Sequence, residues 1–428
     1  MTKNEQKNYT LPIIMMVFLF GMISFVTNLA APMGKILINQ FGVSTTLGSL
    51  GNFANFIAYA VMGIPGGIML QRFGYKKTAL IAIAIGIIGV FIQYLSGGAG
   101  SFVVYLTGAF VAGFSMCLLN MVVNPMLNTL GGGGNKGNQL IQVGGSFNSV
   151  MGTITPMLVG ALVGELTKAN ITDVYPVLYI AMGVFAFAFI VIAISKLPEP
   201  HAEKAKEPLG ALITGALKFR HFVLGAIAIF VYVGVEVGTP MYMDQWLTKG
   251  VGISTTISGF VYGTYWFLML IGRLTGAAIG KKVSSKTMLW ATSAVGLLLV
   301  ALAMISSVDS KVNLPVLQQD AVGAISFGLA QVPVNALYLV LVGLCTSIMW
   351  GGIFNLAVEG LGKYLAAASG IFMVLVCGGG ILPTIQGWLV DLTSSYQISY
   401  WVIIVGLAYL LFYALVGSKN VNKDIPVD

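Results

Sequence analysis

Long apolar runs separated by short polar segments dominate this chain from end to end. A helix that crosses a lipid bilayer needs about 20 mostly apolar residues, and twelve stretches of this kind follow one another along the sequence. They begin near Leu11, Thr46, Thr78, Phe102, Asn138, Val174, Phe222, Ser254, Thr287, Val334, Ala366 and Tyr400. The pattern predicts an all-α membrane protein with twelve transmembrane helices in a lipid bilayer.

The composition indicates the same class of protein. Hydrophobic residues make up 57% of the chain and charged residues only 8%. A soluble domain carries about 25% charged residues, so an ordinary soluble domain is excluded. The polar residues Met1–Thr10 precede an apolar run that has no small-residue cleavage pattern, so we expect a retained first span rather than a removed signal peptide.

The distribution of lysine and arginine predicts the orientation in the membrane. Of the 22 basic residues, 18 fall in segments on the same side as the N-terminus, and only Lys35, Lys168, Lys249 and Lys311 fall on the other side. Cytoplasmic segments carry the excess of basic residues, so we expect both termini in the cytoplasm. The net charge of +8 then reflects topology, and no nucleic-acid partner is expected.

A polar segment divides the twelve stretches into two sets of six. Residues 196–220 combine proline with charged residues, which is typical of a linker between domains. Segments Gly67–Leu80 and Gly276–Leu289 each contain a glycine-bearing helix end, a basic turn and a Lys-Thr pair, at a constant offset of 209 residues. We therefore predict two pseudo-symmetric six-helix bundles, residues 1–195 and 221–428, joined by a cytoplasmic linker at 196–220.

The glycine-rich turn Gly67–Lys77 resembles the loop motif between helices 2 and 3 of the major facilitator superfamily. The basic residues of that motif hold the cytoplasmic gate. The candidate gate residues are Arg72, Lys76, Lys77 and Arg273. Gln71 stands where the motif usually has an acidic residue, so one gate ion pair is expected to be missing. The resemblance implies the twelve-helix fold of this superfamily.

Five further motifs resemble the fucose/glucose/galactose permease branch of the superfamily, the sugar:cation symporters of bacteria. They are Ile64-Pro65-Gly66-Gly67, Asn124-Pro125, Ser146-Phe147-Asn148-Ser149, Tyr232-Val233-Gly234-Val235-Glu236 and Gly378-Gly379-Gly380-Ile381. The resemblance implies a transporter, not an enzyme, that imports a monosaccharide across the bacterial inner membrane by alternating access. It also implies a co-transported cation, and we expect a monomer without a resident cofactor.

The expected driving ion depends on acids that this chain lacks. Proton-coupled fucose symporters of this branch carry one acid in helix 1 and another in helix 4, and the aligned positions here are Ala31 and Asn120. A proton needs a titrating base, whereas sodium, as a hard cation, binds neutral oxygens. The sequence therefore favours sodium over protons, with uncoupled facilitation as a further alternative. The candidate coupling residues are Glu236, Asn120 and Asn124, and no other metal site is predicted.

Glu236 is the most informative single residue, because it lies within an apolar helix. A carboxylate in hydrocarbon is costly and usually faces a cavity that holds a substrate or ion. A sugar needs amides and carboxylates for its hydroxyls and aromatic faces for its C–H groups. The candidate substrate-binding residues are Asn28, Asn52, Asn55, Asn120, Asn124, Gln142, Tyr232, Glu236, Tyr265, Trp266, Trp350 and Asn355. The competing interpretation is that these polar groups only join helices to one another.

Three other functions compete with sugar import. A membrane-embedded enzyme is disfavoured because both histidines, His201 and His221, lie in or beside the linker and the spans contain no metal-ligand cluster. A drug exporter would prefer an aromatic cavity with few amides, which the asparagine-rich faces argue against. An anionic sugar or another small polar metabolite stays open as a substrate, because Lys35 near the outer end of helix 1 could attract a carboxylate.

Overall fold

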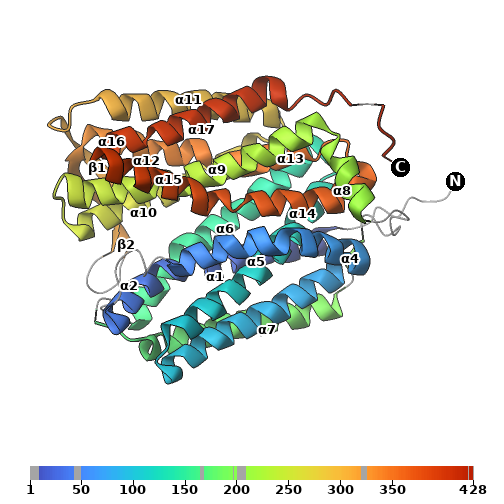
Figure 1. Ribbon diagram of the computed structural model, residues 1–428, viewed down its shortest axis with the longest axis horizontal. Coiled ribbons are helices and arrows are strands. Elements are labelled where there is room, and N and C mark those ends of the chain that lie inside the picture. Colours follow the sequence, from blue (N-terminus) through green and yellow to red (C-terminus); the bar gives the residue numbers. More distant parts are fainter. Residues whose placement is uncertain are drawn as a thin grey trace.

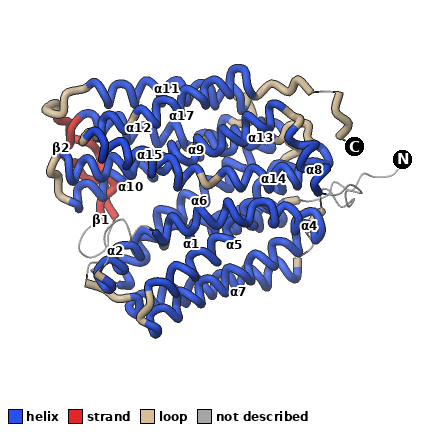
Figure 2. The backbone as a smooth tube through the Cα atoms, in the orientation of Figure 1, coloured by secondary structure: helices blue, strands red, loops and turns tan. Residues whose placement is uncertain are grey.

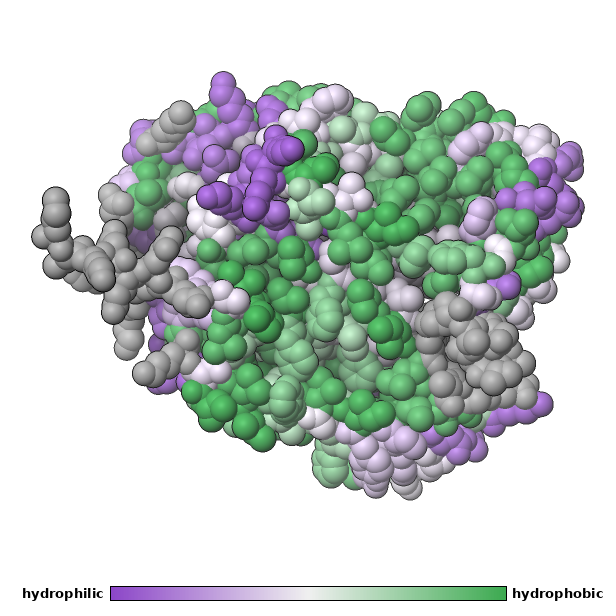
Figure 3. All heavy atoms as spheres, turned by 180° about the vertical axis from the view of Figure 1, so that it is seen from behind, coloured by the Kyte–Doolittle hydropathy of each residue, from purple (hydrophilic) through white to green (hydrophobic). Residues whose placement is uncertain are grey.

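The computed structural model describes residues 9–42, 50–163, 168–195, 197–199, 209–319, 325–422 and 424–427. Nearly all of them are helical, as the tube in Figure 2 shows. The described ends of the chain lie at the same end of the molecule in Figure 1, and a short β-hairpin lies at the opposite end. On the face drawn in Figure 3, apolar residues fill a broad central region, and hydrophilic residues gather toward the two ends.

The described residues of the first half of the chain form five long helices and three shorter elements. They are α1 (Thr10–Asn28), α2 (Ala30–Phe41), α4 (Leu50–Ala99), α5 (Phe102–Leu130), α6 (Gly134–Val163), the 3-10 helix η1 (Ile171–Val174), α7 (Tyr175–Ile194) and α8 (Leu209–Leu217). Helix α4 contains the second and third predicted spans. Gly74 separates them with a φ of 76°, a left-handed conformation that favours glycine.

The second half contains more interrupted helices. Its elements are α9 (Arg220–Gln245), η2 (Trp246–Gly250), α10 (Thr255–Ile279), α11 (Ser285–Ile305), β1 (Lys311–Gln319), β2 (Ile325–Pro333), α12 (Val334–Thr346), α13 (Met349–Ala357), η3 (Gly362–Tyr364), α14 (Leu365–Leu375), α15 (Gly378–Thr393), α16 (Tyr396–Ser399), α17 (Trp401–Phe412) and η4 (Tyr413–Gly417). The tenth, eleventh and twelfth predicted spans are each built from successive pieces.

The predicted all-α membrane fold is confirmed. Among the described residues, nine helical segments are long and apolar enough to cross a membrane, and one of them, within α4, covers two predicted spans. Helices α6 and α10 are not among the nine although they have 30 and 25 residues. They account for the fifth and eighth spans. Their polar residues lie where the two halves of the chain meet.

The hairpin of β1 and β2 is an element that the hydrophobic pattern did not predict. Its strands pair antiparallel, with Lys311 opposite Pro333. The side chains alternate between two faces, as in any strand: Leu314 and Val316 are buried, whereas Phe327 and Leu329 are exposed. The hairpin lies against α10, where the Leu317 amide donates to Thr264 Oγ1 over 3.0 Å.

The two halves meet through two sets of helices. Helix α4 packs against α14 and α15, and α6 packs against α10 and α13. The α4 contact is close because it is lined by glycine: a methyl group added to Gly63 would lie 2.7 Å from the Gly370 carbonyl oxygen. Residues 196 and 200–208 of the linker lie outside the described residues, and the domain boundaries at 195 and 221 stay predictions.

Candidate substrate-binding site

Glu236 lies in the second half of the molecule with three aromatic or charged neighbours. Tyr232, one turn earlier on α9, donates its hydroxyl hydrogen to Glu236 Oε1 over 2.8 Å. Arg273 on α10 donates from Nη2 to the same oxygen over 3.3 Å. The Tyr265 hydroxyl donates to the Glu236 backbone carbonyl over 3.3 Å. The sequence-predicted Glu236, Tyr232 and Tyr265 therefore do lie together.

Arg273 connects this group to the first half of the molecule. Its Nη1 donates to the Gly145 carbonyl over 2.9 Å and to Ser149 Oγ over 2.7 Å, both on α6. A third, longer contact of 3.3 Å reaches Asn148 Oδ1. Its Nε donates to the Ser347 carbonyl over 3.2 Å. The sequence predicted Arg273 only as a gate residue. In the structure its side chain lies beside Glu236.

A chain of amides leads from the first half to the second. Asn120 on α5 donates to the Tyr59 hydroxyl over 2.9 Å, and Asn124, one turn later, donates to the Asn120 backbone carbonyl over 2.8 Å. The Asn124 Oδ1 accepts a hydrogen bond of 2.9 Å from Trp350 Nε1 on α13. The predicted Asn120, Asn124 and Trp350 are thus joined, and the Asn124–Trp350 bond crosses between the halves.

Aromatic rings connect the amide chain to the Glu236 group. Trp350 lies edge-to-face with Tyr232, with ring centroids 6.3 Å apart. Tyr265 lies edge-to-face with Trp266 at 5.5 Å. Trp350 and Trp266 are half-buried, whereas Tyr232 and Tyr265 are fully buried. The two tryptophans are thus the less buried members of this aromatic group, and aromatic rings of this kind suit the C–H groups of a sugar ring.

Further hydrogen bonds between the halves lie toward the end where the termini lie. Asn128 donates to Asn355 Oδ1 over 2.8 Å, and Asn355 in turn donates to Ser285 Oγ over 2.9 Å. Gln142 donates to the Ile348 carbonyl over 2.9 Å, and Gln139 donates to the Ala277 carbonyl over 2.8 Å. The predicted residues Gln142 and Asn355 thus lie in contacts between the halves.

The remaining candidates lie apart from this network. Asn28, near the end of α1, donates to the Ser24 carbonyl and hydroxyl over 2.9 and 3.0 Å. Asn55 is 8% exposed, and its Oδ1 has no hydrogen-bond partner among the described residues. The side chain of Asn52 lies outside the described residues.

The basic residues of the predicted gate lie at the turn inside α4. Lys76 Nζ donates to the Ala193 and Ser195 carbonyls, each over 2.7 Å, and so caps the end of α7 within the same half. Arg72 and Lys77 are exposed. Glu199 accepts hydrogen bonds from the backbone amides of Tyr75 and Lys76 over 2.7 and 3.1 Å. Glu199 thus supplies a carboxylate, from a distant part of the sequence, at the turn that follows Gln71.

The sequence reasoning missed Glu199, Gln139 and Ser285 as contact residues. No spacing signal could have found Glu199 or Ser285, because their partners lie far away in the sequence. Gln139 could have been found, because it lies three residues before the predicted Gln142 on one helix.

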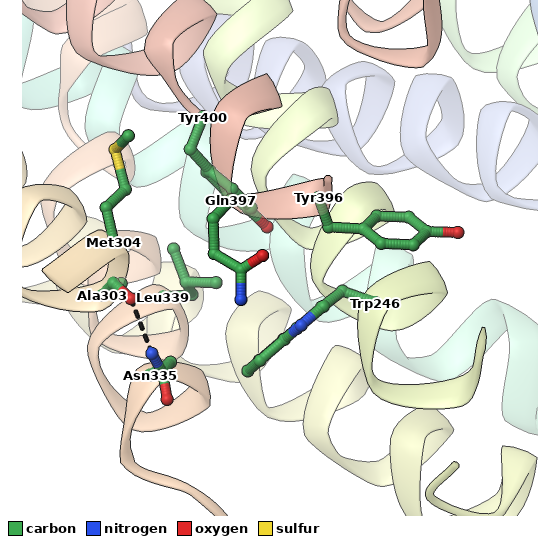
Figure 4. A pocket seen from close by; sticks show the side chains of 8 residues that line it. All are labelled: Trp246, Ala303, Met304, Asn335, Leu339, Tyr396, Gln397 and Tyr400. Atoms are coloured by element: carbon green, nitrogen blue, oxygen red, sulfur yellow. Dashed lines mark hydrogen bonds between the residues drawn. The ribbon is translucent and has the colours of Figure 1, made fainter. Parts of the chain in front are cut away.

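One pocket outlined by the described residues lies away from this network. It is lined by residues that include Trp246, Asn335, Tyr396 and Tyr400 (Figure 4), and it lies at the hairpin end of the second half (Figure 1). Asn335 is engaged there with the carbonyls of Ala303 and Ser306, over 2.7 and 2.9 Å. Among the described residues, no group of three His, Cys, Asp or Glu side chains could hold a metal ion.

Comparison with known proteins defines the class of protein. Residues 13–384 match the model of the Major Facilitator Superfamily, and the chain belongs to this superfamily. It is therefore a multi-pass membrane transporter and not an enzyme.

Individual relatives cover almost the whole chain. A glucose/galactose transporter of Brucella abortus is 28% identical over 97% of this chain and 96% of its own length. The L-fucose-proton symporter of Escherichia coli is 20% identical over 98% of this chain and 96% of its own length. The crystal structure of the superfamily transporter FucP, in the outward conformation, superposes on this chain with a TM-score of 0.80 at 17% identity. The superposition covers 96% of this chain and all of the FucP chain, which shows that the two share a fold.

Proposed function

We propose that this protein imports a neutral monosaccharide of the glucose or galactose type across the bacterial inner membrane by alternating access. One observation carries the proposal: the carboxylate of Glu236, the amide chain of Asn120 and Asn124, and the ring of Trp350 meet where the two halves join. A transporter of this architecture binds its substrate at such a place. The likeness to glucose/galactose transporters over nearly the full chain supports the same substrate class.

The hydrogen bonds between the halves support an outward-facing state. Those between pairs of described residues lie in the middle of the molecule or toward the end that carries the termini. With both termini in the cytoplasm, as the basic residues predict, these contacts close the cytoplasmic side. A sugar would then enter from the outside and reach the layer of Glu236 and Trp350.

Sodium is the proposed driving ion. The Glu236 carboxylate is already paired with the Arg273 guanidinium, so an added cation would compete with a charge fixed in the protein. Neutral oxygens offer an alternative, and Asn55 Oδ1 is a buried oxygen without a partner among the described residues. Asn120 and Asn124 stay candidate coupling residues beside it. The fucose-proton relative makes a proton the competing ion.

An anionic sugar is the second candidate substrate, because Arg273 places a guanidinium among the candidate binding groups. The test uses purified protein in vesicles, a panel of labelled hexoses and sugar acids, and sodium and proton gradients imposed separately. Accumulation of glucose or galactose under a sodium gradient supports the full proposal. Accumulation under a proton gradient alone refutes sodium coupling, and a preference for sugar acids refutes the neutral substrate.

A further inference from the structure

We propose that the Glu236–Arg273 pair selects substrates by net charge: the carboxylate cancels the guanidinium charge that would otherwise recruit sugar acids. This inference rests on the proposed sugar transport and names what the pair recognises in the substrate, which is its neutrality. It gives Arg273 a role in specificity, where the sequence suggested a gate.

Both members of the pair remain accessible. The Glu236 side chain is 14% exposed and the Arg273 side chain 11% exposed, so neither is sealed into the protein. Glu236 accepts the hydrogen bonds from Tyr232 and Arg273 on the same oxygen, Oε1. No hydrogen bond between described residues reaches the second carboxylate oxygen, Oε2. Among the contacts of the described residues, Oε2 therefore keeps its acceptor capacity for a ligand.

Arg273 offers a donor next to that acceptor. A guanidinium carries two hydrogens on each terminal nitrogen. Nη1 has three acceptors from α6, whereas Nη2 has only Glu236 Oε1 among the described residues. Among the described residues, the second hydrogen on Nη2 thus has no acceptor. A donor and an acceptor side by side match neighbouring hydroxyl groups of a neutral sugar, because each hydroxyl both donates and accepts.

Among the described contacts of Arg273, only Glu236 balances the positive charge of the guanidinium. An arginine in a protein is always charged. Its other described partners, the carbonyls of Gly145 and Ser347 and the side chains of Asn148 and Ser149, are neutral. Removing the Glu236 charge would leave an uncompensated cation, which favours an anionic partner. With Glu236 present, the carboxylate of a sugar acid meets a like charge at the same place, and such repulsion is an effective source of specificity.

The pair also belongs to one half of the molecule. Glu236 on α9 and Arg273 on α10 lie in the second half, whereas Gly145 and Ser149 lie in the first half. When the halves separate during transport, Arg273 loses its contacts with α6 but keeps its partner on α9. Selection by charge therefore operates on both sides of the membrane.

The test measures binding of glucose, glucuronate and protonated glucosamine to the purified protein, by competition against a labelled hexose and by direct titration. Charge-assisted hydrogen bonds differ from neutral ones enough to change affinity about tenfold or more. Glu236→Gln should therefore raise the ratio of glucuronate to glucose affinity by about tenfold or more. Arg273→Gln should raise the ratio of glucosamine to glucose affinity instead. The double variant E236Q/R273Q should return both ratios toward those of the wild type.

Controls separate this inference from the proposed function. Asp309→Asn removes one negative charge from an exposed turn and should leave both ratios unchanged. Wild-type protein that binds no hexose counts against the proposed function. Wild-type protein that binds glucose, with unchanged ratios in both single variants, overturns the inference alone. If one single variant does not fold, the other tests the same claim with a ligand of opposite charge.

Discussion

Three hydrogen bonds between the halves should hold the cytoplasmic side of this transporter closed. They join Asn124 to Trp350, Asn128 to Asn355 and Gln142 to the Ile348 carbonyl, over 2.9, 2.8 and 2.9 Å. Hydrogen bonds between helices in membranes contribute about 0.6 kcal/mol each. Removing all three should therefore destabilise the closed side by about 2 kcal/mol, which shifts the conformational equilibrium about twentyfold. The combined variant is Trp350→Phe, Asn128→Ala and Gln142→Leu.

The assay is the distance between spin labels at Lys136 and Lys281, two exposed positions on opposite halves at the end that carries the termini. The native cysteines are first replaced, because Cys377 is only half-buried. The wild type should give mainly the short distance, and the triple variant should populate a longer one. A matched control removes three exposed hydroxyls that bond only within their own helices: Thr107→Val, Thr214→Val and Thr275→Val. Equal distance distributions in the wild type and the triple variant would refute the reasoning.

Three further predictions concern the fold. A cysteine introduced as Asn170→Cys should react with impermeant reagents in intact cells, whereas one introduced as Lys281→Cys should not. Labelling of position 281 from outside would contradict the predicted orientation with both termini in the cytoplasm. Gly63→Ala should push α4 away from α14 and lengthen the same spin-label distance, because the new methyl group would lie 2.7 Å from backbone atoms. The control Gly183→Ala meets nothing within 4 Å and should leave the distance unchanged. Equal distances in both variants would exclude a tight contact at Gly63. Glu199→Ala removes two hydrogen bonds that backbone amides donate to the carboxylate, and it should lower the free energy of unfolding by about 1 kcal/mol. Thermal unfolding measures this change, and an unchanged Tm would show that the Glu199 contact contributes nothing to stability.

The hydrophobic pattern predicted most of the fold because span length and apolar content are local properties. It failed at the hairpin of β1 and β2, where alternation extends over only nine residues per strand. The structure divides the eleventh predicted span into α14 and α15 at the glycine motif Gly378-Gly379-Gly380. Gly378 also packs closely against the Phe230 backbone, so the helix break and a close contact between α15 and α9 occur at the same glycine.

The candidate site was only partly readable from the sequence. Glu236 stood out because a carboxylate inside an apolar helix is rare. Tyr232 could be placed beside it, since residues four apart share a helix face. The partner of Glu236 could not be found in this way, because Arg273 lies 37 residues away on another helix. The same limit applies to Asn124 and Trp350, which are 226 residues apart and meet only when the halves assemble.

The central claim is that a neutral sugar crosses the membrane through the layer between the halves. Exchange of labelled glucose or galactose into vesicles preloaded with the same unlabelled sugar tests it most directly, because exchange needs no ion gradient. We predict rapid exchange by the wild type, and its loss when a cross-link between Lys136→Cys and Lys281→Cys locks the halves together. The absence of exchange for every neutral hexose, or exchange that continues unchanged through the cross-linked protein, would contradict the account.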